Sequence, residues 1–595
     1  MKGAGLPSNA RLRDFNADPR IMLLSLLGAL LGGAGAVLAW MLLHLIYAAT
    51  NLFYYQRLSW SFVSPAQNVL GWLAVFVPIA GGIIIGVMAR FGSDKIRGHG
   101  MPEAIEAILM QGARIHPRVA IFKPLSAAVA IGSGGPFGAE GPIIMTAGSV
   151  GSLLGQLFHL TDAERTTLLV AGAAAGMTGV FSTPLAAVLL AVELLLFEWR
   201  PRSFIPVAIA ATAAGALRRY LLSADPLFPM PQLNHAVQPV AIMAALGLGL
   251  LGGAAALVLS KAVYASEDLF EHHLPVHWMW WPAIGGVVIG VGGLIFPRAL
   301  GTGYDVIASL VGGDHTWGLI LGVLIVKSVI WSFSLGSGTS GGILAPLLMI
   351  GGALGALVGP FLPTLQAGAW PLIGMAAVLS GAIGCPLTSA VLSVELTHNY
   401  ALMLPLLASA VTAHAFTVMF QRRSILTERL SRRGHHLSRE YSVDPLESMI
   451  VSQIMQPDLS GSPTDSASLD GLQLLEGGKS GQGSVVSGRV REEVDVVIAC
   501  LEQDEAVTRA ATTGTLVPGT ELLAFPGETL RTLAERMATG HLSAIRVIDP
   551  ASGTTLGRVT LEDILLARVR SHDRENRLER VRRIRLPFTR PRNPS

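Results

Sequence analysis

The stretch GSGGPFGAEGP, residues 132–142, contains five glycines, two prolines and a single charged residue, Glu140. Apolar segments flank it on both sides. Glycine and proline interrupt helices, so the stretch predicts a helix break inside an apolar region. The carboxylate at the break is unexpected, because an ionisable group at membrane depth is costly and usually functional.

The composition is that of a membrane protein. Of the 595 residues, 51% are hydrophobic and 14% are charged, whereas about a quarter of the residues in a soluble domain are charged. The run 21–50 has no Asp, Glu, Lys or Arg, and about twenty apolar residues span a bilayer. Further uncharged runs lie at 68–89, 124–139, 143–161, 167–192, 203–217, 236–260, 274–297, 315–326, 328–393 and 401–420. Because peptide groups in lipid must be paired within helices, these runs predict an all-α polytopic membrane protein.

Basic residues at both ends of the membrane region predict its orientation. They are Lys2, Arg11, Arg13, Arg20, Arg422, Arg423, Arg429, Arg432 and Arg433. Lys and Arg concentrate on the cytoplasmic side, so we expect an inner or plasma membrane protein with both termini in the cytoplasm. The net charge of +3 gives no reason to expect a nucleic-acid partner. Two cysteines, Cys385 and Cys500, are too few for a disulfide framework.

The sequence contains an internal repeat. GHG at 98–100 returns as GTG at 301–303, an offset of 203 residues. GSGGPFGAEGP returns as GSGTSGGILAP, 336–346, at an offset of 204, and TPLAAVLLAVEL, 183–194, returns as CPLTSAVLSVEL at an offset of 202. The nearly constant offset predicts two homologous halves, 21–222 and 235–420. Such duplication is typical of transporters, whose sites lie between the repeats and are built from broken helices.

Three breaks share one design, in which glycines precede a proline and a helix-like run. They are GHGMPEAIEAI from residue 98, GAEGPIIM from 138 and GGILAPLLM from 341. The first N–H groups of a helix lack partners and carry about half a positive charge, so they bind anions. Three such ends at one point would hold an anion without Lys or Arg. The candidate anion-binding residues are Gly98, His99, Gly100, Met101, Pro102, Gly138, Ala139, Gly141, Pro142, Gly342, Ile343, Leu344, Ala345 and Pro346.

Glu140 stands at the second of these helix starts. A carboxylate there can occupy the anion position and leave it when protonated or displaced, which makes Glu140 the candidate gate and proton carrier. The alternative is a cap that only stabilises the helix end through its dipole. The membrane region has no His-Glu-x-x-His motif and no convincing nucleophile–base pair. We therefore expect no metal, no cofactor for chemistry and no enzymatic activity.

These segments resemble the CLC family of chloride channels and proton/chloride antiporters over roughly residues 20–430. GHGMP, GAEGP and GILAP match the family's three anion-binding segments in order, and STPLAAVLLAVE and CPLTSAVLSVELTHNY match the ends of its two halves. The resemblance implies the CLC fold of two inverted-topology repeats, in the lipid bilayer, as a homodimer with one pore per subunit. It also implies that Glu140 is the gating glutamate and that the N–H groups of Ile343 and Leu344 face the central anion.

Three pore positions depart from the family pattern. His99 stands where a serine often donates its hydroxyl to the ion. A neutral imidazole can still donate one hydrogen bond, or the ring can turn away while the backbone binds the ion. Leu344 replaces a phenylalanine, which we interpret as a packing change. Leu426 falls where a tyrosine usually completes the inner side of the site.

The inner proton acceptor of the family's antiporters also differs. The resemblance places Leu194 at that position, beside Glu193, which becomes the candidate second proton carrier. Glu193 has a repeat partner, Glu395, and this favours a shared structural role instead. Glu198 lies one turn further on, in a segment that reads as a helix end.

The chain becomes charged beyond the second half. Outside the two halves we expect an N-terminal cytoplasmic segment at 1–20, a linker at 421–471, a regulatory region at 472–567 and a basic tail at 568–595. From residue 525 the pattern predicts helix, strand, strand and helix, and it resembles the second half of a CBS-domain pair. VSQIMQPDL at 451–459 is a candidate opening of the first copy. The resemblance implies an adenine-nucleotide site at Thr560 and Asp563, and the alternative is a dimerising scaffold without a ligand.

We therefore expect a CLC-type pore that transports a small inorganic anion such as chloride and is gated by Glu140. A proton-coupled exchanger and a passive channel both remain open, and so do nitrate, bicarbonate and fluoride as the anion. Fluoride ranks lower because the family's fluoride exporters replace the proline that is retained here as Pro142. The rival of a different class is a cation-coupled transporter of organic anions, which needs a cation site of carboxylates that the sequence does not show.

Overall fold

The computed structural model describes residues 20–432 except 224, 232–236, 315 and 422; residues 446 and 449–457; and residues 523–576 except 541, 550–551 and 553. The chain divides after Arg432 into a helical unit and a second unit, which we describe separately. Most of the expected N-terminal segment, linker and basic tail lies outside the described residues. Lys2, Arg11, Arg13, Arg422 and Arg433, used above to predict orientation, lie there as well.

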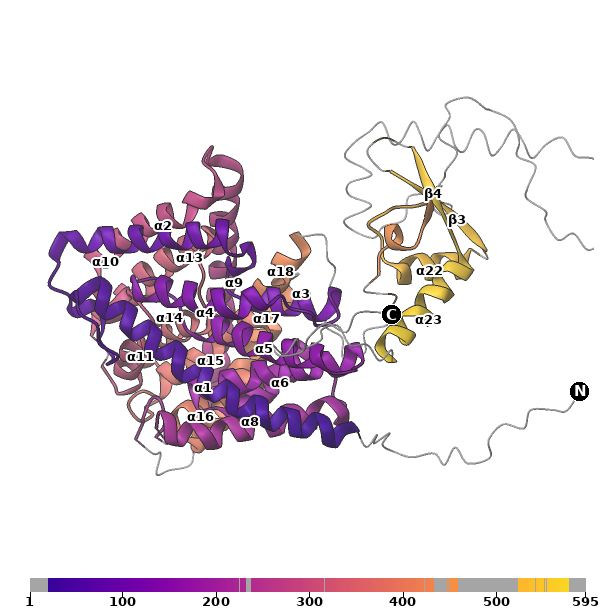
Figure 1. The fold of residues 1–595 in the computed structure, drawn as a ribbon. Helices are drawn as coiled ribbons and strands as arrows, with labels where there is room; N and C mark the ends of the chain where they lie inside the picture. Colours follow the sequence, from indigo (N-terminus) through magenta and orange to yellow (C-terminus); the bar gives the residue numbers. More distant parts are fainter. Residues whose placement is uncertain are drawn as a thin grey trace, which may run out of the picture. The chain divides into compact units, whose positions relative to one another are not determined.

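The first unit is built of helices (Figure 1). The first half contains α1 (Arg20–Tyr55), α2 (Phe76–Phe91), α3 (Met101–Met110), α4 (Pro117–Gly132), α5 (Glu140–Leu157), α6 (Asp162–Phe181), α7 (Pro184–Leu190) with its π-helical extension (Ala191–Leu196), and α8 (Pro201–Leu221). The second half contains α9 (Pro239–Asp268), α10 (Trp281–Ile295), α11 (Tyr304–Val311), α12 (Trp317–Leu321), α13 (Ser328–Gly336), α14 (Leu344–Val358), α15 (Ala369–Ile383), α16 (Pro386–Thr397) and α17 (Met403–Phe420). A last helix, α18 (Ile425–Arg432), follows.

The helices are long and apolar enough for a membrane. Seven helical segments in the described residues meet the length and hydropathy of a span: Arg20–Tyr55, Gly71–Phe91, Pro239–His273, Trp278–Ile295, Trp317–Gly336, Leu344–Phe361 and Tyr400–Arg429. Every residue of α15 is buried, whereas α1 exposes large apolar side chains such as Met22 and Leu26. An apolar exterior around a packed interior is what lipid as a solvent favours, and the prediction of a polytopic α-helical membrane protein is confirmed.

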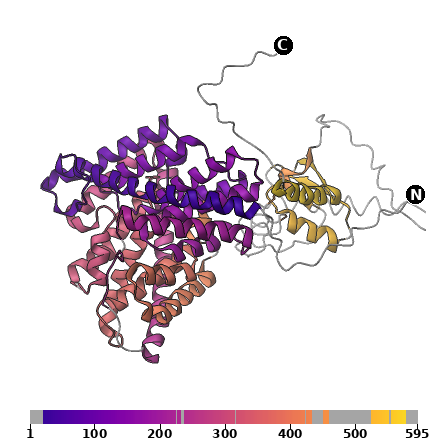
Figure 2. The ribbon, with the colours of Figure 1, turned by 60° about the horizontal axis from the view of Figure 1, so that its bottom comes forward.

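The two halves lie on either side of the helical unit and contact each other through matching residues. Figure 2 shows the indigo-to-purple first half and the pink-to-orange second half on different sides. Where α2 meets α10, a Cβ added to Gly82 would lie 2.4 Å from the Pro282 carbonyl oxygen, and one added to Gly286 would lie 2.5 Å from that of Pro78. Only glycine permits this approach, which small residues provide between membrane helices. The matching contacts agree with the predicted duplication.

The second unit contains a small mixed sheet with helices. Its strands are β1 (Gln456–Pro457), β2 (Leu523–Ala524), β3 (Ala544–Ile548) and β4 (Thr555–Thr560), in the order β1-β4-β3-β2. Strands β3 and β4 form an antiparallel hairpin, β2 pairs parallel to β3, and the helices are α22 (Leu530–Thr539) and α23 (Leu561–Asn576). The predicted helix, strand, strand and helix are therefore present. Alternating burial along β3 packs Ile545 and Val547 against α22 in one apolar core.

The sequence made segment 451–459 a candidate opening of a first CBS copy. In the structure its residues Gln456 and Pro457 pair with the C-terminal sheet. They form β1, which pairs antiparallel with Arg558 and Gly557 of β4. The segment thus adds an edge strand to the C-terminal sheet. The sequence could not show this pairing, because it joins residues about a hundred positions apart across 458–522, which lie outside the described residues.

Candidate functional site

The N-termini of α5 and α14 meet near the centre of the helical unit. Gly138 N donates to the Gly342 carbonyl oxygen at 3.2 Å, and Gly342 N donates to the Gly138 carbonyl oxygen at 2.9 Å. The two glycines are 204 residues apart, at the offset of the repeat. This reciprocal pair fixes the starts of the two helices side by side, so that their first N–H groups face a common space.

The Glu140 side chain fills that space. Its carboxylate is fully buried, and Oε1 accepts a hydrogen bond from the Ala345 N–H at 3.1 Å. The amides of Glu140 itself and of Leu344 also interact with it. The side chain curls back over Gly138, because a Cβ added there would lie 1.9 Å from Oε2 and 2.3 Å from Oε1. The carboxylate therefore occupies the position that an anion bound at these helix ends would take.

The first predicted segment packs directly on the second. Gly100 has φ +87° and precedes α3, and its N–H donates to Glu103 Oε2 at 3.0 Å. A Cβ on Gly141 would lie 2.0 Å from the His99 carbonyl oxygen and 3.1 Å from the Gly342 Cα. His99 is 2% exposed. The structure thus brings all three predicted segments together, with their backbones in contact.

The other predicted residues of these segments lie in the same place. Met101 and Pro102 open α3, Ala139 and Pro142 flank Glu140 on α5, and Ile343 and Pro346 flank the start of α14; all are buried. The resemblance implied that the amides of Ile343 and Leu344 face a central anion, and this stays a prediction. The amides of α14 around the Glu140 carboxylate are those of Leu344 and Ala345.

Two lysines support the segments from behind. Lys123 is fully buried, and its Nζ donates to the carbonyl oxygens of Ile96 and Gly98 at 2.9 and 2.8 Å. Lys327, 204 residues later, is also fully buried and donates to two carbonyl oxygens in 299–301 at 2.8 and 2.9 Å. A lysine side chain that donates to two carbonyl oxygens fixes the loop before each helix start.

Glu193, the candidate second proton carrier, caps a helix. One of its oxygens accepts from the Thr388 N–H at 2.8 Å and from the Thr388 hydroxyl at 2.5 Å, and the other accepts from the Leu387 N–H at 3.2 Å. Glu395 does the same for α7, accepting from the Ala186 N–H at 2.8 Å. Leu194, at the family's inner acceptor position, is fully buried. The reciprocal caps account structurally for the repeat of this glutamate.

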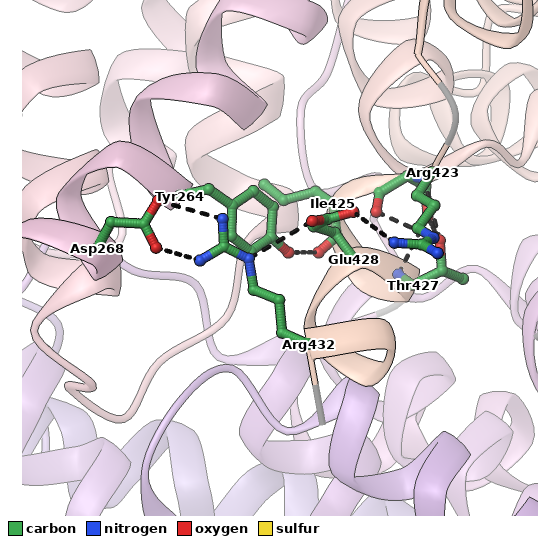
Figure 3. A network of polar contacts seen from close by, with 8 residues as sticks. Tyr264, Asp268, Arg423, Ile425, Thr427, Glu428 and Arg432 are labelled. Carbon is green, nitrogen blue, oxygen red and sulfur yellow. Dashed lines mark hydrogen bonds and ion pairs between the residues drawn. The ribbon is translucent and has the colours of Figure 1, made fainter. Parts of the chain in front are cut away.

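Helix α18 lies within the predicted linker 421–471 but packs in the helical unit, against α3. The charged residues of this segment predicted a solvent-exposed linker. In the structure several of them form ion pairs within the helical unit (Figure 3). Arg432 forms ion pairs with Asp268 of α9 and with Glu428, and its guanidinium lies 4.7 Å from the centre of the Tyr264 ring. The Tyr264 hydroxyl donates to the Ile425 carbonyl oxygen. These contacts hold the last helix on α9.

Leu426, at the position of the family's inner tyrosine, is fully buried. One turn further along α18, the Arg429 guanidinium lies 3.8 Å from a Glu103 oxygen and 3.9 Å from a Glu267 oxygen. A Cβ on Gly98 would lie 2.1 Å from Arg429 Nη1. A charged cluster from α3, α9 and α18 therefore packs against the first segment at Gly98.

Sequence reasoning missed Lys123, Lys327 and Arg429. A signal for the lysines was present: the uncharged runs 124–139 and 328–393 each begin directly after a lysine, and these lysines are 204 residues apart. Arg429 carries no comparable signal, because its partners come from helices distant in sequence. Among the described residues, no group of three or more His, Cys, Asp or Glu side chains is placed to hold a metal ion.

In the second unit, Thr560 and Asp563 bind each other. Asp563 Oδ2 accepts from the Thr560 N–H at 2.9 Å and from its hydroxyl at 2.7 Å, and the Asp563 N–H donates back to that hydroxyl at 3.2 Å. Burial acts to raise the pKa of Asp563, but the hydrogen bonds from Thr560 and Gln456 and the charge of Arg558 together hold this pKa below its usual value. The pair caps the start of α23.

This geometry defines a class of protein: a duplicated membrane transporter whose broken helices present backbone amides to an anion and to a carboxylate that occupies the same position. The sequence profile of the family described as voltage gated chloride channel matches residues 80–418. The chain belongs to this family, and its resemblance to CLC proteins is confirmed.

Known relatives agree in sequence and fold. The H(+)/Cl(-) exchange transporter ClcA of Cronobacter sakazakii is 30% identical over 422 residues, covering 67% of this chain and 87% of that protein. The structure of a slow cyanobacterial Cl−/H+ antiporter matches with a TM-score of 0.62 at 21% identity, covering 70% of this chain and 98% of that one. The structure of a CLC-type fluoride/proton antiporter matches with a TM-score of 0.59 at 20% identity, covering 67% and 96%. The predicted CLC fold is confirmed.

Proposed function

We propose that this protein transports a small inorganic anion, chloride in the first place, through a pore gated by Glu140. The observation that carries the proposal is the buried Glu140 carboxylate, which accepts from the Ala345 N–H at 3.1 Å where α5 and α14 begin. An anion can take this position once the side chain leaves. Backbone amides supply partial rather than full charges, so an anion bound there is held weakly enough to leave again.

Proton-coupled exchange is the first mechanism to consider. One support is the similarity to relatives that are H(+)/Cl(-) exchange transporters. The other is the Glu140 carboxylate, which lies in the proposed anion path and can carry a proton there. Protonation would neutralise Glu140 and weaken its hold on the amides of α14. The anion and the proton would then use the same position in turn.

Passive conduction is the second mechanism, and the inner side of the pore supports it. Leu194 cannot carry a proton, and both oxygens of Glu193 are bound by α16. Glu198 accepts from the Ser203 hydroxyl at 2.5 Å and pairs with Arg200 at 3.2 Å, so it too has a structural partner. Without an inner proton carrier, Glu140 would act only as a gate.

The identity of the anion is a separate part of the proposal. Chloride is supported by the family, and fluoride by the similarity to a fluoride/proton antiporter structure. Pro142, retained at the gate motif, favours chloride over fluoride. Nitrate and bicarbonate are to be compared alongside them, because amides select for charge and size rather than for one element.

We further propose a homodimer in the inner or plasma membrane, with both termini cytoplasmic and a CBS-like scaffold at 472–567. An adenine nucleotide at Thr560 and Asp563 is the alternative role of that region. The mutual hydrogen bonds of these two side chains favour the scaffold, since a nucleotide would have to replace them. A thermal shift of the full-length protein with ATP would support the nucleotide role, provided that Asp563→Asn abolishes it.

The proposed function is tested by flux from liposomes that contain the purified protein, with anion and proton movement recorded together for chloride, fluoride, nitrate and bicarbonate. We expect chloride flux, and we expect Glu140→Ala to keep that flux while removing its dependence on pH. The control variant is Glu271→Gln, which changes an exposed glutamate. Proton uptake driven by an anion gradient identifies an exchanger, and anion flux alone identifies a channel. Absence of flux for all four anions would refute the proposal.

A further inference from the structure

The two halves are also joined at two equivalent places away from the central glycine pair. Gly98 N, at the start of the first predicted anion segment, donates to the Gly338 carbonyl oxygen at 3.3 Å. Gly301 N donates to the Gly134 carbonyl oxygen at 3.1 Å. Gly301 and Gly338 follow Gly98 and Gly134 by 203 and 204 residues, and all four have positive φ. The duplicated backbone thus makes the same contact between the halves twice.

At the first of these contacts the side chain that covers the glycine is charged. Arg97 directly precedes Gly98, and its guanidinium carbon lies 4.8 Å from the centre of the Trp278 ring and 5.5 Å from that of Trp281. A Cβ added to Gly338 would lie 3.1 Å from Arg97 Nη2 and 3.2 Å from Nε. A guanidinium within about 6 Å of a ring centre is attracted by the ring. Arg97 therefore connects the first anion segment to two tryptophans and a glycine of the second half.

The two tryptophans are themselves fixed in place. A short 3-10 helix, Trp278–Trp280, precedes α10, and the Trp281 Nε1–H donates to the Val276 carbonyl oxygen at 3.0 Å. On α2, a Cβ added to Gly86 would lie 2.0 Å from the Met279 carbonyl oxygen, so this short helix packs directly on the first half. The planar guanidinium of an arginine stacks on aromatic faces, and here it has a fixed aromatic surface to stack on.

At the second contact the equivalent residues are apolar. By the repeat offsets, Leu300 takes the place of Arg97, and Ala74 and Val77 take the places of the two tryptophans. Leu300 and Ala74 belong to one buried apolar cluster, and Val77 packs against it. A Cβ added to Gly134 would lie 3.4 Å from Leu300 Cδ2. Aliphatic side chains are therefore enough to build this junction, so the fold alone does not require an arginine with two tryptophans at the other.

We propose that Arg97 is a positioning residue for anion transport: its stack on Trp278 and Trp281 fixes the start of the first anion segment on the second half, and this sets how the segment discriminates between anions. The inference rests on the proposed function. Lys123 already holds the carbonyl oxygens on either side of Arg97 from within the first half, and Arg97 adds the attachment to the second half. Binding groups keep their geometry only when surrounding contacts fix them, and this segment is fixed to both halves.

The test measures, for the full-length protein in liposomes, the concentrations of chloride and of nitrate that give half-maximal flux. The ratio of these two concentrations does not depend on how much folded protein each liposome holds. We expect Arg97→Leu and Trp278→Leu each to change the ratio about two- to fivefold, the factor that corresponds to a partly exposed cation–π contact. The double substitution should give no further change, because either substitution alone breaks the same contact.

The matched control is Arg57→Leu, which removes an exposed arginine whose guanidinium carbon lies 5.4 Å from the centre of the Tyr55 ring. It should leave the ratio unchanged. Two milder variants serve if leucine disturbs folding: Arg97→Lys keeps the charge and Trp278→Phe keeps a ring, and each should change the ratio in the same direction but less.

Three results would overturn the inference. The ratio could change in Arg97→Leu but not in Trp278→Leu, which would show that the charge acts without the stack. The two changes could add in the double substitution, which would give the residues independent roles. The ratio could also stay the same in every variant. Absence of flux in the unmodified protein would instead refute the proposed function.

Discussion

The two halves of the helical unit share their supporting contacts and differ where those contacts meet the anion path. Gly138 and Gly342 exchange hydrogen bonds across the centre, and Lys123 and Lys327 each bind two carbonyl oxygens before a helix start. Each pair is one residue type used twice. The paired positions therefore build the scaffold, because a duplicated fold needs the same backbone support in both halves.

The two halves differ at the first residues of the helices that begin at the site. Glu140 begins α5, and the equivalent start of α14 is Leu344. Met101 begins α3, and its equivalent is Tyr304. A second carboxylate at the central site would face the first, and like charges at such a distance cannot both ionise. With one carboxylate at this site, Glu140 of the first half binds the amides of α14 in the second half without facing a second negative charge.

The largest effect is expected at the paired lysines. Lys123→Met and Lys327→Met each leave two buried carbonyl oxygens without a donor, and we expect each to lower the free energy of unfolding by about 3–5 kcal/mol. Thermal unfolding of the purified variants measures this, with the exposed Lys261→Met as the control. If only one of the two substitutions lowered the free energy of unfolding, the two lysines would not contribute equally to the stability of the two halves.

The next largest effect is expected at Gly138 and Gly342, where alanine should have different consequences at the two positions. A Cβ at Gly138 would meet only atoms of the flexible Glu140 side chain among its three nearest neighbours, at 1.9 to 2.4 Å. We expect Gly138→Ala to displace the carboxylate and raise anion flux at neutral pH about tenfold, equal to about 1.4 kcal/mol, with stability nearly unchanged. A Cβ at Gly342 also lies 2.7 Å from the Gly138 carbonyl oxygen, so Gly342→Ala should lose stability as well. A Gly138→Ala variant with normal pH gating would contradict the position assigned to Glu140.

A smaller effect is expected at the reciprocal caps. Glu193→Gln and Glu395→Gln each replace a carboxylate that binds backbone amides of the other half, and we expect each to cost about 1 kcal/mol of stability. Proton movement in liposomes should be the same in both variants. Loss of proton movement in Glu193→Gln alone would make Glu193 a proton carrier and would break the symmetry of this pair.

The smallest effect is expected at another carboxylate cap, that of Asp563 at the start of α23 in the second unit. The pKa of Asp563 is lowered in the folded unit, so its contribution to stability is present above the unfolded pKa of about 3.9 and is lost as the pH falls through the lower folded pKa. We expect Asp563→Asn to cost about 0.5 kcal/mol at neutral pH and to remove this acid dependence. Unfolding of the full-length protein followed by hydrogen exchange in α23 measures both. An unchanged acid dependence in Asp563→Asn would exclude the carboxylate as its source.

The sequence was sufficient to predict the elements that depend on local pattern. Glycine, proline and apolar runs predicted the starts of α3, α5 and α14, and the constant offset predicted the repeat. Glu140 was identified because a single carboxylate in an apolar break is costly to bury and is therefore rarely incidental. The same logic found the helices and strands after residue 525, where alternating and helical patterns are clear.

What the sequence could not predict depends on contacts between distant segments. The Arg429 cluster joins α18 to α3 and α9, and charges in a segment after the last span read as a soluble linker. The packing of Tyr304 against Phe181 and Phe228 likewise joins elements that are distant in sequence. Which amides of α14 the Glu140 carboxylate reaches, those of Leu344 and Ala345, depends on how the side chain bends over Gly138.

The Glu140 carboxylate is attached to the helix whose end it fills, and this has a consequence for how the protein responds to salt. A tethered group presents a constant effective concentration at its site, on the order of millimolar or more for a short connection. If Glu140 gates the pore as proposed, an anion in solution competes with that constant, so the fraction of open sites would follow the anion concentration on the side that the site faces. The rate of transport would then depend on the salt content of that compartment, and the length of the covalent connection would set the concentration at which the rate rises.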